Sequence, residues 1–213
     1  MSGPAIKICG ISNPAALDAA IGARAEHAGF NFYPPSPRAL KPADAAVLGA
    51  RAAGRIGTVG VFVDADDNTI GEMVAAARLD AIQLHGGETP ERAAQVRARF
   101  ALPVWKVLAV TGPADIARAD AFAGAADFIL FDAKTPKGAL PGGMGLVFDW
   151  SLLSAYRGSL PWGLAGGLTA DNVAGAVRVT GAPLVDTSSG VESAPGVKDV
   201  DKIAAFCKAA RQS

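Results

Sequence analysis

Eight short apolar segments, separated by stretches with helical patterns, constrain the fold of this chain more than any other feature. Most of the segments lack the polar alternation of a strand that has one face in solvent. Strands buried on both faces, as in a parallel sheet covered by helices, have this character. We therefore expect strands to begin near Ala5, Ala28, Thr58, Ala81, Val104, Asp127, Trp162 and Leu184.

The stretches between the expected strands carry helix start signals. Asn13 and Thr89 each precede a proline, which is the arrangement of a capping side chain followed by proline at the first helical position. Thr169 is the expected cap of another helix. The last helix is expected over residues 198–210, with four residues on its buried stripe: Val200, Ile203, Ala204 and Cys207.

Eight strands that alternate with helices indicate an α/β fold, a (β/α)8 TIM barrel, although an open doubly wound sheet uses the same alternation with fewer strands. We find no linker or low-complexity segment, so residues 1–213 are expected to form one catalytic domain. The longest interval lies between the sixth and seventh expected strands. Its extra residues, 134–150, are rich in Gly and Pro, and are equally consistent with a lid and with a plain surface insertion.

Composition excludes several classes of partner. The chain has 20 basic and 20 acidic side chains, which disfavours nucleic acid or an anionic membrane as the main partner. No apolar run approaches the ~20 residues that span a bilayer. The start of the chain lacks a signal-peptide pattern. Cys9 and Cys207, the two cysteines, suit neither a disulfide framework nor a metal site, so we expect a cytoplasmic protein without a metal.

Active sites of this fold lie at the carboxyl ends of the strands and in the loops that follow. Cys9 ends the first strand and Asp132 ends the sixth, so the two would face each other across the barrel mouth. A base on one side of a substrate and an acid on the other need this arrangement. Equally, Cys9 could be a small buried hydrophobe, and Asp132 a partner for Lys134.

The seventh and eighth strands end in glycine-rich turns, Gly166–Gly167 and Ser188–Ser189–Gly190. Small residues let backbone N–H groups approach an anion closely, and phosphate sites in this fold often follow these two strands. The segment after Gly190 would supply the start of a short helix. The sequence therefore favours a phosphate site over turns without a ligand.

Further polar residues near the strand ends have two interpretations each. Arg38 follows three prolines and suits a carboxylate or phosphate, or it is a solvated loop residue. His85 and Gln83 contact substrate or bond to each other in the core. Lys7 points into the barrel and needs a partner, and the candidate is Asp186 on the adjacent eighth strand. Asp186 is also a candidate for contact with the substrate.

Seven segments together resemble the successive motifs of one enzyme family. They are KICGIS, GFNFYPPSPR, QLHG, FDAKTPKG, GGMGLVFDW, LAGGLTADNV and DTSSGVE. They occur in the family's order, between residues 7 and 192, and resemble those of the phosphoribosylanthranilate isomerases. Met144 departs from the pattern, since Thr or Ser is usual there, and Thr187 stands where an aliphatic residue is usual.

The resemblance implies an aldose–ketose isomerase of tryptophan biosynthesis that needs no cofactor. Its reaction would be the Amadori rearrangement of N-(5'-phosphoribosyl)anthranilate. By similarity, Asp132 is the general acid, Cys9 is the general base, and Arg38 binds the anthranilate carboxylate. The phosphate would be held by Gly142–Gly143, Gly166–Gly167 and Ser188–Ser189–Gly190. The protein would be a monomer or a homodimer.

Two expectations about protonation follow from these roles. Only the thiolate of Cys9 is a base, so we expect a lowered thiol pKa, with Lys7 helping. Asp132 must carry a proton for part of the cycle. Two other functions remain open: a related sugar-phosphate isomerase of histidine biosynthesis, whose family has an aspartate on the first strand, and a barrel that binds a phosphorylated ligand without turnover.

Overall fold

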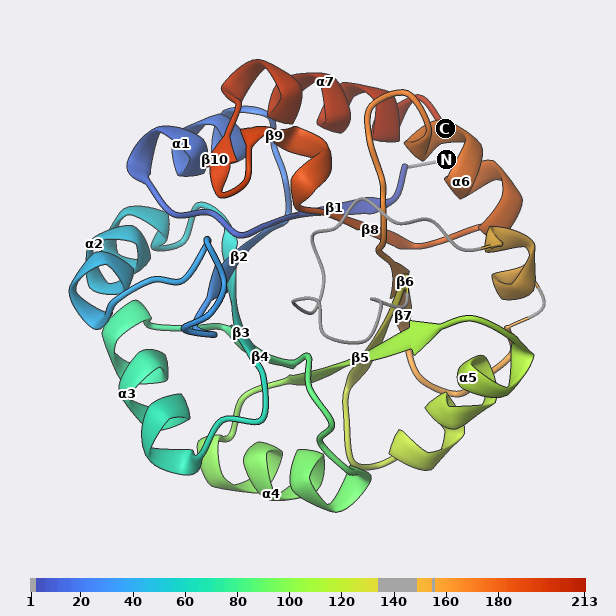
Figure 1. Ribbon diagram of the computed structural model, residues 1–213, viewed down its shortest axis with the longest axis horizontal. Helices are drawn as coiled ribbons and strands as arrows, with labels where there is room; N and C mark the ends of the chain where they lie inside the picture. Colours follow the sequence, from blue (N-terminus) through green and yellow to red (C-terminus); the bar gives the residue numbers. More distant parts are fainter. Residues whose placement is uncertain (1–2, 134–148, 155) are drawn as a thin grey trace.

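A computed structural model of the chain shows a closed barrel of eight parallel strands surrounded by helices (Figure 1). The structure describes residues 3–133, 149–154 and 156–213. The barrel strands are β1 Ala5–Cys9, β2 His27–Asn31, β3 Gly57–Phe62, β4 Ala81–Leu84, β5 Val104–Val110, β6 Phe128–Ala133, β7 Trp162–Leu164 and β8 Leu184–Thr187. Each begins within one residue of its expected position, and the (β/α)8 barrel is confirmed.

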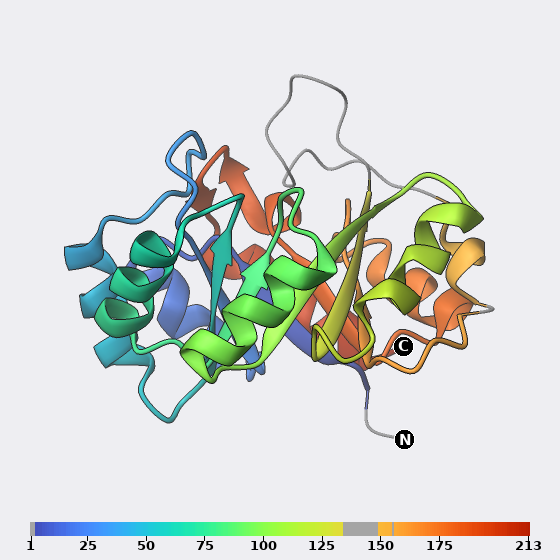
Figure 2. The same cartoon turned by 90° about the horizontal axis from the view of Figure 1, so that it is seen from below.

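The helices lie outside the barrel, between successive strands (Figure 2). The α-helices are α1 Pro14–Gly22, α2 Pro42–Ala52, α3 Asp67–Ala77, α4 Pro90–Phe100, α5 Pro113–Ala117, α6 Val173–Thr180 and α7 Val200–Arg211. The 3₁₀ helices are η1 Arg118–Phe122, η2 Trp150–Leu153 and η3 Ser189–Val191. An antiparallel hairpin, β9 Glu192–Ala194 with β10 Val197–Lys198, separates η3 from α7. Among the described residues, only the short η2 lies between β6 and β7.

Two of the three expected helix caps are confirmed. Asn13 Oδ1 accepts the Ala16 N–H at 2.9 Å, and Thr89 Oγ1 accepts the Arg92 N–H at 3.3 Å. The expected cap at Thr169 is wrong, because α6 begins only at Val173 and the Thr169 N–H is itself bonded to Asn172.

The predicted buried stripe of α7 is wrong in two of its four positions. Val200 and Ala204 are exposed. Burial instead follows Ile203, Phe206, Cys207 and Ala210. Ile203 and Cys207 are packed in the core, as expected. The buried face of the helix is therefore rotated slightly from the predicted one and shares these two positions with it.

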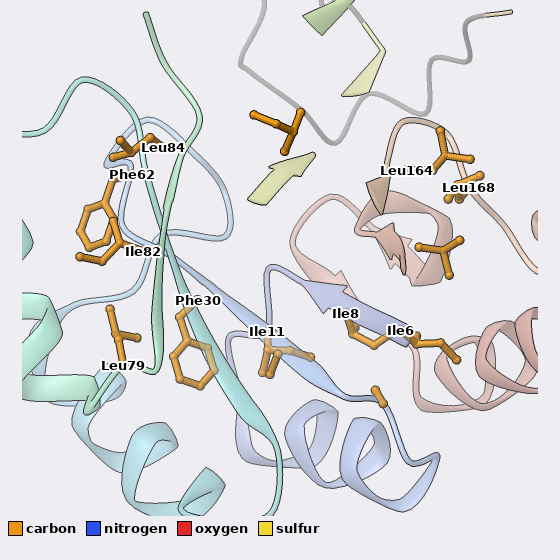
Figure 3. Close-up of a cluster of buried hydrophobic side chains, with 14 of the residues drawn as sticks. Ile6, Ile8, Ile11, Phe30, Phe62, Leu79, Ile82, Leu84, Leu164 and Leu168 are labelled. Carbon is orange, nitrogen blue, oxygen red and sulfur yellow. The ribbon is translucent and has the colours of Figure 1, made fainter. Parts of the chain in front are cut away.

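Two groups of apolar side chains stabilise the barrel. The larger group fills the space between the strands and the helices, and it includes Ile6, Ile8, Phe30 and Ile82 (Figure 3). The smaller group comes from the alternate strand positions, which point into the barrel. Its buried members are Val59, Ala81, Trp105, Val107, Leu130, Ala165 and Leu184. The barrel is therefore a packed core rather than a pore.

The same inward-pointing face becomes polar toward the carboxyl ends of the strands. Lys7 is two residues after Ala5 on β1, and Asp186 is two residues after Leu184 on β8. Lys7 and Asp186 are register partners where β8 closes the barrel against β1. No helix among the described residues is both long and apolar enough to cross a membrane.

Candidate active site

The carboxyl ends of the strands converge on one pocket, as the fold requires. Ten of the residues predicted from the sequence line it: Cys9, Arg38, His85, Asp132, Gly166, Gly167, Asp186, Ser188, Ser189 and Gly190. Gln83 does not line it, because its side chain is fully buried beneath the mouth. Gly142, Gly143 and Met144 lie outside the described residues. The pocket thus collects most of the candidate site from six loops and strand ends.

Lys7 is buried beneath the pocket and paired as expected. Its Nζ lies 3.1 Å and 3.0 Å from the two carboxylate oxygens of Asp186. Burial alone would lower the pKa of Lys7, but the Asp186 carboxylate outweighs it, and the pKa of Lys7 lies above its ordinary value. A buried lysine therefore stays charged, because it donates hydrogen bonds to both oxygens of a carboxylate.

Cys9 sits directly above this ion pair. A Cβ built on Gly29, its neighbour on β2, would lie 3.0 Å from Cys9 Sγ and 3.1 Å from Lys7 Nζ. Glycine at this position is what lets the thiol and the ammonium group share the space. Cys9 is partly exposed to the pocket, so its sulfur is both accessible and close to a fixed charge.

The predicted lowering of the thiol pKa is wrong for this structure. Burial raises the pKa of Cys9 above its ordinary value, and the nearby Asp186 carboxylate raises it further. The Lys7 and Lys198 ammonium groups lower the pKa but do not outweigh these effects. The prediction failed because it counted the charge of Lys7 without the cost of burying the thiolate, which is the largest cause of the shift.

Asp132 lines the same pocket as Cys9 from the end of β6, which is three strands away from β1 around the closed barrel. Its Oδ2 lies 3.4 Å from His85 Nε2, and its Oδ1 accepts the N–H of the next residue, Ala133, at 2.8 Å. A Cβ on Gly166, whose φ is +88°, would lie 2.9 Å from Asp132 Oδ1. The Gly166 turn therefore packs directly against the carboxyl group that we expect to be the acid.

Gln83 supports His85 from below. Its Nε2 lies 3.3 Å from His85 Nδ1, while its Oε1 is buried without a hydrogen-bond partner among the described residues. Donation from the amide to Nδ1 leaves the hydrogen of a neutral imidazole on Nε2, toward Asp132. Of the two interpretations of Gln83, bonding to His85 is the one the geometry supports.

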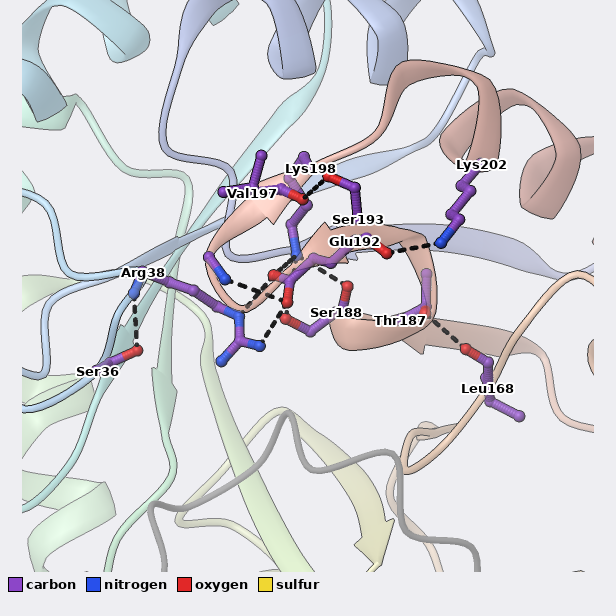
Figure 4. Close-up of polar contacts among 11 residues, drawn as sticks. Ser36, Arg38, Leu168, Thr187, Ser188, Glu192, Ser193, Val197, Lys198 and Lys202 are labelled. Carbon is purple, nitrogen blue, oxygen red and sulfur yellow. Dashed lines mark hydrogen bonds and ion pairs between the residues drawn. The ribbon is translucent and has the colours of Figure 1, made fainter.

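Arg38 is held in a buried cluster that the sequence analysis did not predict (Figure 4). Its guanidinium group makes a bidentate ion pair with Glu192, from Nε to Oε1 at 2.8 Å and from Nη2 to Oε2 at 2.7 Å. Lys198 Nζ bonds to Glu192 Oε1 at 2.7 Å and to the carbonyl oxygen of Ser188 at 2.9 Å. A signal for Glu192 was present, since it ends the DTSSGVE segment, but none singled out Lys198.

The two glycine-rich turns pack against each other. Thr187 Oγ1 donates to the carbonyl oxygen of Leu168 at 2.7 Å, so the threonine that departs from the family pattern ties β8 to the turn after β7. A Cβ on Gly190 would lie 2.0 Å from that same carbonyl oxygen. A short helix is present here as η3, Ser189–Val191, but the second half of the segment expected to start it, Glu192 and Ser193, belongs to strand β9. Only small residues allow these turns to meet at the pocket.

Within the described ranges, no three side chains of the types His, Cys, Asp and Glu are grouped so that they could hold a metal ion. The groups available for chemistry in the pocket are instead a thiol, carboxyls, an imidazole and an arginine. These groups move protons and bind anions.

Comparison with known proteins decides the family. Residues 6–209 match the family model described as N-(5'phosphoribosyl)anthranilate (PRA) isomerase. The chain belongs to the phosphoribosylanthranilate isomerase family. An N-(5'-phosphoribosyl)anthranilate isomerase of Paramagnetospirillum magneticum is 55% identical over 207 residues, covering 97% of this chain and 96% of that protein. The one from Rhizobium meliloti is 49% identical over 209 residues, covering 98% and 97%.

Solved structures of the family have the same barrel. The Thermotoga maritima phosphoribosyl anthranilate isomerase matches with a TM-score of 0.88 at 36% identity, covering 99% of this chain and 100% of that one. Another isomerase structure, in complex with reduced 1-(o-carboxyphenylamino)-1-deoxyribulose 5-phosphate, matches with a TM-score of 0.86 at 34% identity, with the same coverage. Family membership decides between the two isomerases that the sequence left open, in favour of the tryptophan-pathway enzyme.

Proposed function

We propose that Cys9 and Asp132 carry out the isomerisation of N-(5'-phosphoribosyl)anthranilate to 1-(2-carboxyphenylamino)-1-deoxyribulose 5-phosphate, an Amadori rearrangement of tryptophan biosynthesis. The observation that carries the proposal is the placement of the two groups. In a chain of this family, a thiol from β1 and a carboxyl from β6 line the same pocket. A substrate between them can be protonated from one side and deprotonated from the other.

The acid step opens the sugar ring. The Asp132 carboxyl gives its proton to the ring oxygen, the bond from C1 to that oxygen breaks, and the nitrogen lone pair forms a C=N bond at C1. The product is a positively charged Schiff base, and Asp132 becomes a carboxylate. His85 Nε2, at 3.4 Å from Asp132 Oδ2, is placed to orient this group and to contact the substrate.

The base step removes the proton from C2. The positive charge of the Schiff base acidifies that proton, and the same charge stabilises a thiolate at Cys9. The thiolate takes the proton and the C2 electrons form an enol, which tautomerises to the ketone. Burial raises the pKa of the Cys9 thiol in the protein alone. The positive charge of the Schiff base intermediate is therefore what stabilises the thiolate during the reaction.

The anionic ends of the substrate have matching groups in the pocket. Arg38 binds the anthranilate carboxylate, since a guanidinium group suits a planar carboxylate. Backbone N–H groups of the Gly166–Gly167 and Ser188–Ser189–Gly190 turns bind the phosphate, together with the serine hydroxyls. Gly142–Gly143 remain part of the proposed phosphate site. Asp186 acts from below by holding Lys7.

The chemistry as proposed uses no cofactor, because each step is a proton transfer. The cytoplasm is the proposed compartment, supported by biosynthetic relatives and two free cysteines. A monomer and a homodimer are both compatible with the family, since one neighbour is described as monomers generated from a dimeric Thermotoga maritima isomerase.

Following anthranilate fluorescence while the purified protein consumes phosphoribosylanthranilate tests the proposal. Wild type should quench the fluorescence, while Cys9→Ala and Asp132→Asn should each lower kcat by about 10²–10⁴-fold. Cys207→Ala, which removes the other thiol on an outer helix, is the matched control and should keep kcat near wild type. A wild type that binds the reduced product analogue without quenching would favour a non-catalytic binding protein instead.

A further inference from the structure

The carboxylate of Glu192 is saturated by groups of the protein. Its Oε1 accepts from Arg38 Nε at 2.8 Å and from Lys198 Nζ at 2.7 Å. Its Oε2 accepts from Arg38 Nη2 at 2.7 Å and from the Gly196 N–H at 3.3 Å. Glu192 is buried and does not line the pocket. It therefore has no free lone pair to offer to a ligand, and its effect must pass through its neighbours.

Arg38, by contrast, lines the pocket, and the edge of its guanidinium group that carries Nη1 is not bonded to Glu192. Its Nε and Nη2 bond to Glu192, as the dashed lines in Figure 4 show, while Nη1 has no hydrogen-bond partner among the described residues. An arginine carries five N–H donors in a planar fork, so fixing one edge fixes the direction of the other. The bond to Glu192 thus determines where the free edge points.

The segments that carry the two residues also fix their relative position. The stem of Arg38 lies over the turn after Cys9, since a Cβ on Gly10 would lie 2.5 Å from Arg38 Cδ. The hairpin that carries Glu192 docks on the loop before Arg38, where a Cβ on Gly196 would lie 2.7 Å from the Pro37 carbonyl oxygen. Lys198 then ties the same hairpin to Ser188 in the phosphate turn.

We propose that Glu192 is a positioning residue for substrate recognition: it holds Arg38 so that the free edge of its guanidinium group meets the substrate carboxylate. Lys198 balances the charge of Glu192, so the cluster keeps one net positive charge for the carboxylate. This inference rests on the proposed role of Arg38. It adds that the specificity for a carboxylate is set by a residue that never touches the substrate.

The sign of the effect follows from the two charges beside Glu192. Glu192→Gln replaces one acceptor oxygen by an NH₂ group, which faces N–H donors of Arg38 or Lys198. It also leaves two buried cations without their counter-charge, and they repel each other. Arg38 should then turn away from its present direction. We expect this loss of alignment to exceed any gain in attraction for the substrate carboxylate from the extra positive charge.

Binding measurements with two ligands test the inference. The first ligand is reduced 1-(o-carboxyphenylamino)-1-deoxyribulose 5-phosphate, and the second is the same molecule without the carboxyl group. In wild type the first should bind more tightly. In Glu192→Gln its Kd should rise about tenfold, the weight of one hydrogen bond to a charged group, while the Kd of the second stays the same. In turnover, KM should rise and kcat should change little. Glu72→Gln, an exposed carboxylate on α3, is the matched control.

Each alternative outcome has its own meaning. If Glu192→Gln weakens both ligands equally, Glu192 only holds the hairpin in place and the inference is wrong. If wild type does not distinguish the two ligands, the proposed role of Arg38 fails, and the inference fails with it. Should Glu192→Gln not fold, Glu192→Asp serves instead. It keeps the charge but retracts the carboxylate by one methylene, so it should lower the preference for the carboxylate, and an unchanged preference would overturn the inference.

Discussion

The two sides of the barrel mouth hold their polar groups in different ways. On the Cys9 side, Lys7, Asp186, Arg38, Glu192 and Lys198 form buried ion pairs with N–O distances of 2.7–3.0 Å. On the Asp132 side, one histidine–carboxylate contact of 3.4 Å connects β4 and β6, and Gln83 Oε1 has no partner among the described residues. Among the polar groups that line the pocket, those on the first side are therefore held by short ion pairs, and Asp132 on the second side is held by a longer contact to an imidazole.

This difference fits the two proposed tasks. Asp132 must give up a proton and regain it in each cycle, and its side chain contacts an imidazole at 3.4 Å rather than an ammonium or guanidinium group of the described residues. The Cys9 side must bind a carboxylate and lie beside a developing positive charge, and each of its buried charges is paired with an opposite charge of the protein. Substitutions on either side of the mouth test this difference.

The largest expected effect is on the Cys9 side, where Lys7→Met removes one partner of a fully buried ion pair. We expect the free energy of unfolding to fall by about 3 kcal/mol at pH 8, because Asp186 is left buried without a counter-charge. The loss should be smaller at pH 5, since protonation of the unpaired Asp186 in the folded variant relieves it. Urea unfolding at both pH values measures this.

Lys208→Met, at an exposed position near the end of α7, is the control for Lys7→Met and should change stability by less than about 0.5 kcal/mol. A loss for Lys7→Met that is as small as this control would mean that the Cys9 side does not depend on its buried pair.

A smaller effect is expected from Gly29→Ala, which adds a methyl group between the thiol and the ammonium. Its Cβ would lie 3.0 Å from both Cα and Sγ of Cys9, so the β1 backbone or the thiol must shift. We expect stability to fall by about 1–3 kcal/mol and kcat to fall more than KM rises. Gly22→Ala in α1, where no atom lies within 4 Å of the added Cβ, is the control and should not destabilise the protein. Unchanged turnover in Gly29→Ala would show that the position of Cys9 is less constrained than we infer.

The smallest change in stability is expected on the Asp132 side, from Gln83→Met. The substitution removes a buried oxygen that has no partner together with a 3.3 Å bond to His85, so stability should change by less than about 1 kcal/mol. The orientation of His85 should suffer, and kcat should fall a few fold. Gln95→Met, exposed on α4, is the control for both measurements. A loss of stability as large as that of Lys7→Met would contradict the contrast between the two sides.

The sequence predicted what local patterns determine. Strand starts, the caps at Asn13 and Thr89, the partnership of Lys7 with Asp186 and the gathering of Cys9 with the glycine-rich turns all follow from strand order and residue type. Thr169 failed as a cap because α6 begins three residues later than its pattern suggested. The α7 stripe failed because the buried face follows Ile203, Phe206, Cys207 and Ala210, which leaves Val200 and Ala204 exposed.

What the sequence could not predict depends on contacts between segments far apart in the chain. Glu192 bonds to Arg38 only because the hairpin after β8 packs on the loop after β2. No local sequence pattern predicts that contact. The thiol pKa depends on the balance between burial, two cations and one carboxylate. A count of nearby charges gives the wrong sign, because it leaves out the cost of burying the thiolate.

The protonation state of Cys9 before substrate binds can be measured from the pH dependence of its alkylation in the protein without substrate. Peptide mass mapping would count Cys9 separately from Cys207. We predict that the rate follows a thiol pKa above the ordinary value of 9.0, since burial and Asp186 outweigh Lys7 and Lys198. Asp186→Asn should shift the profile to lower pH and Lys7→Met to higher pH. A wild-type profile centred at neutral pH would contradict the account, because Cys9 would then be a thiolate before any substrate arrives.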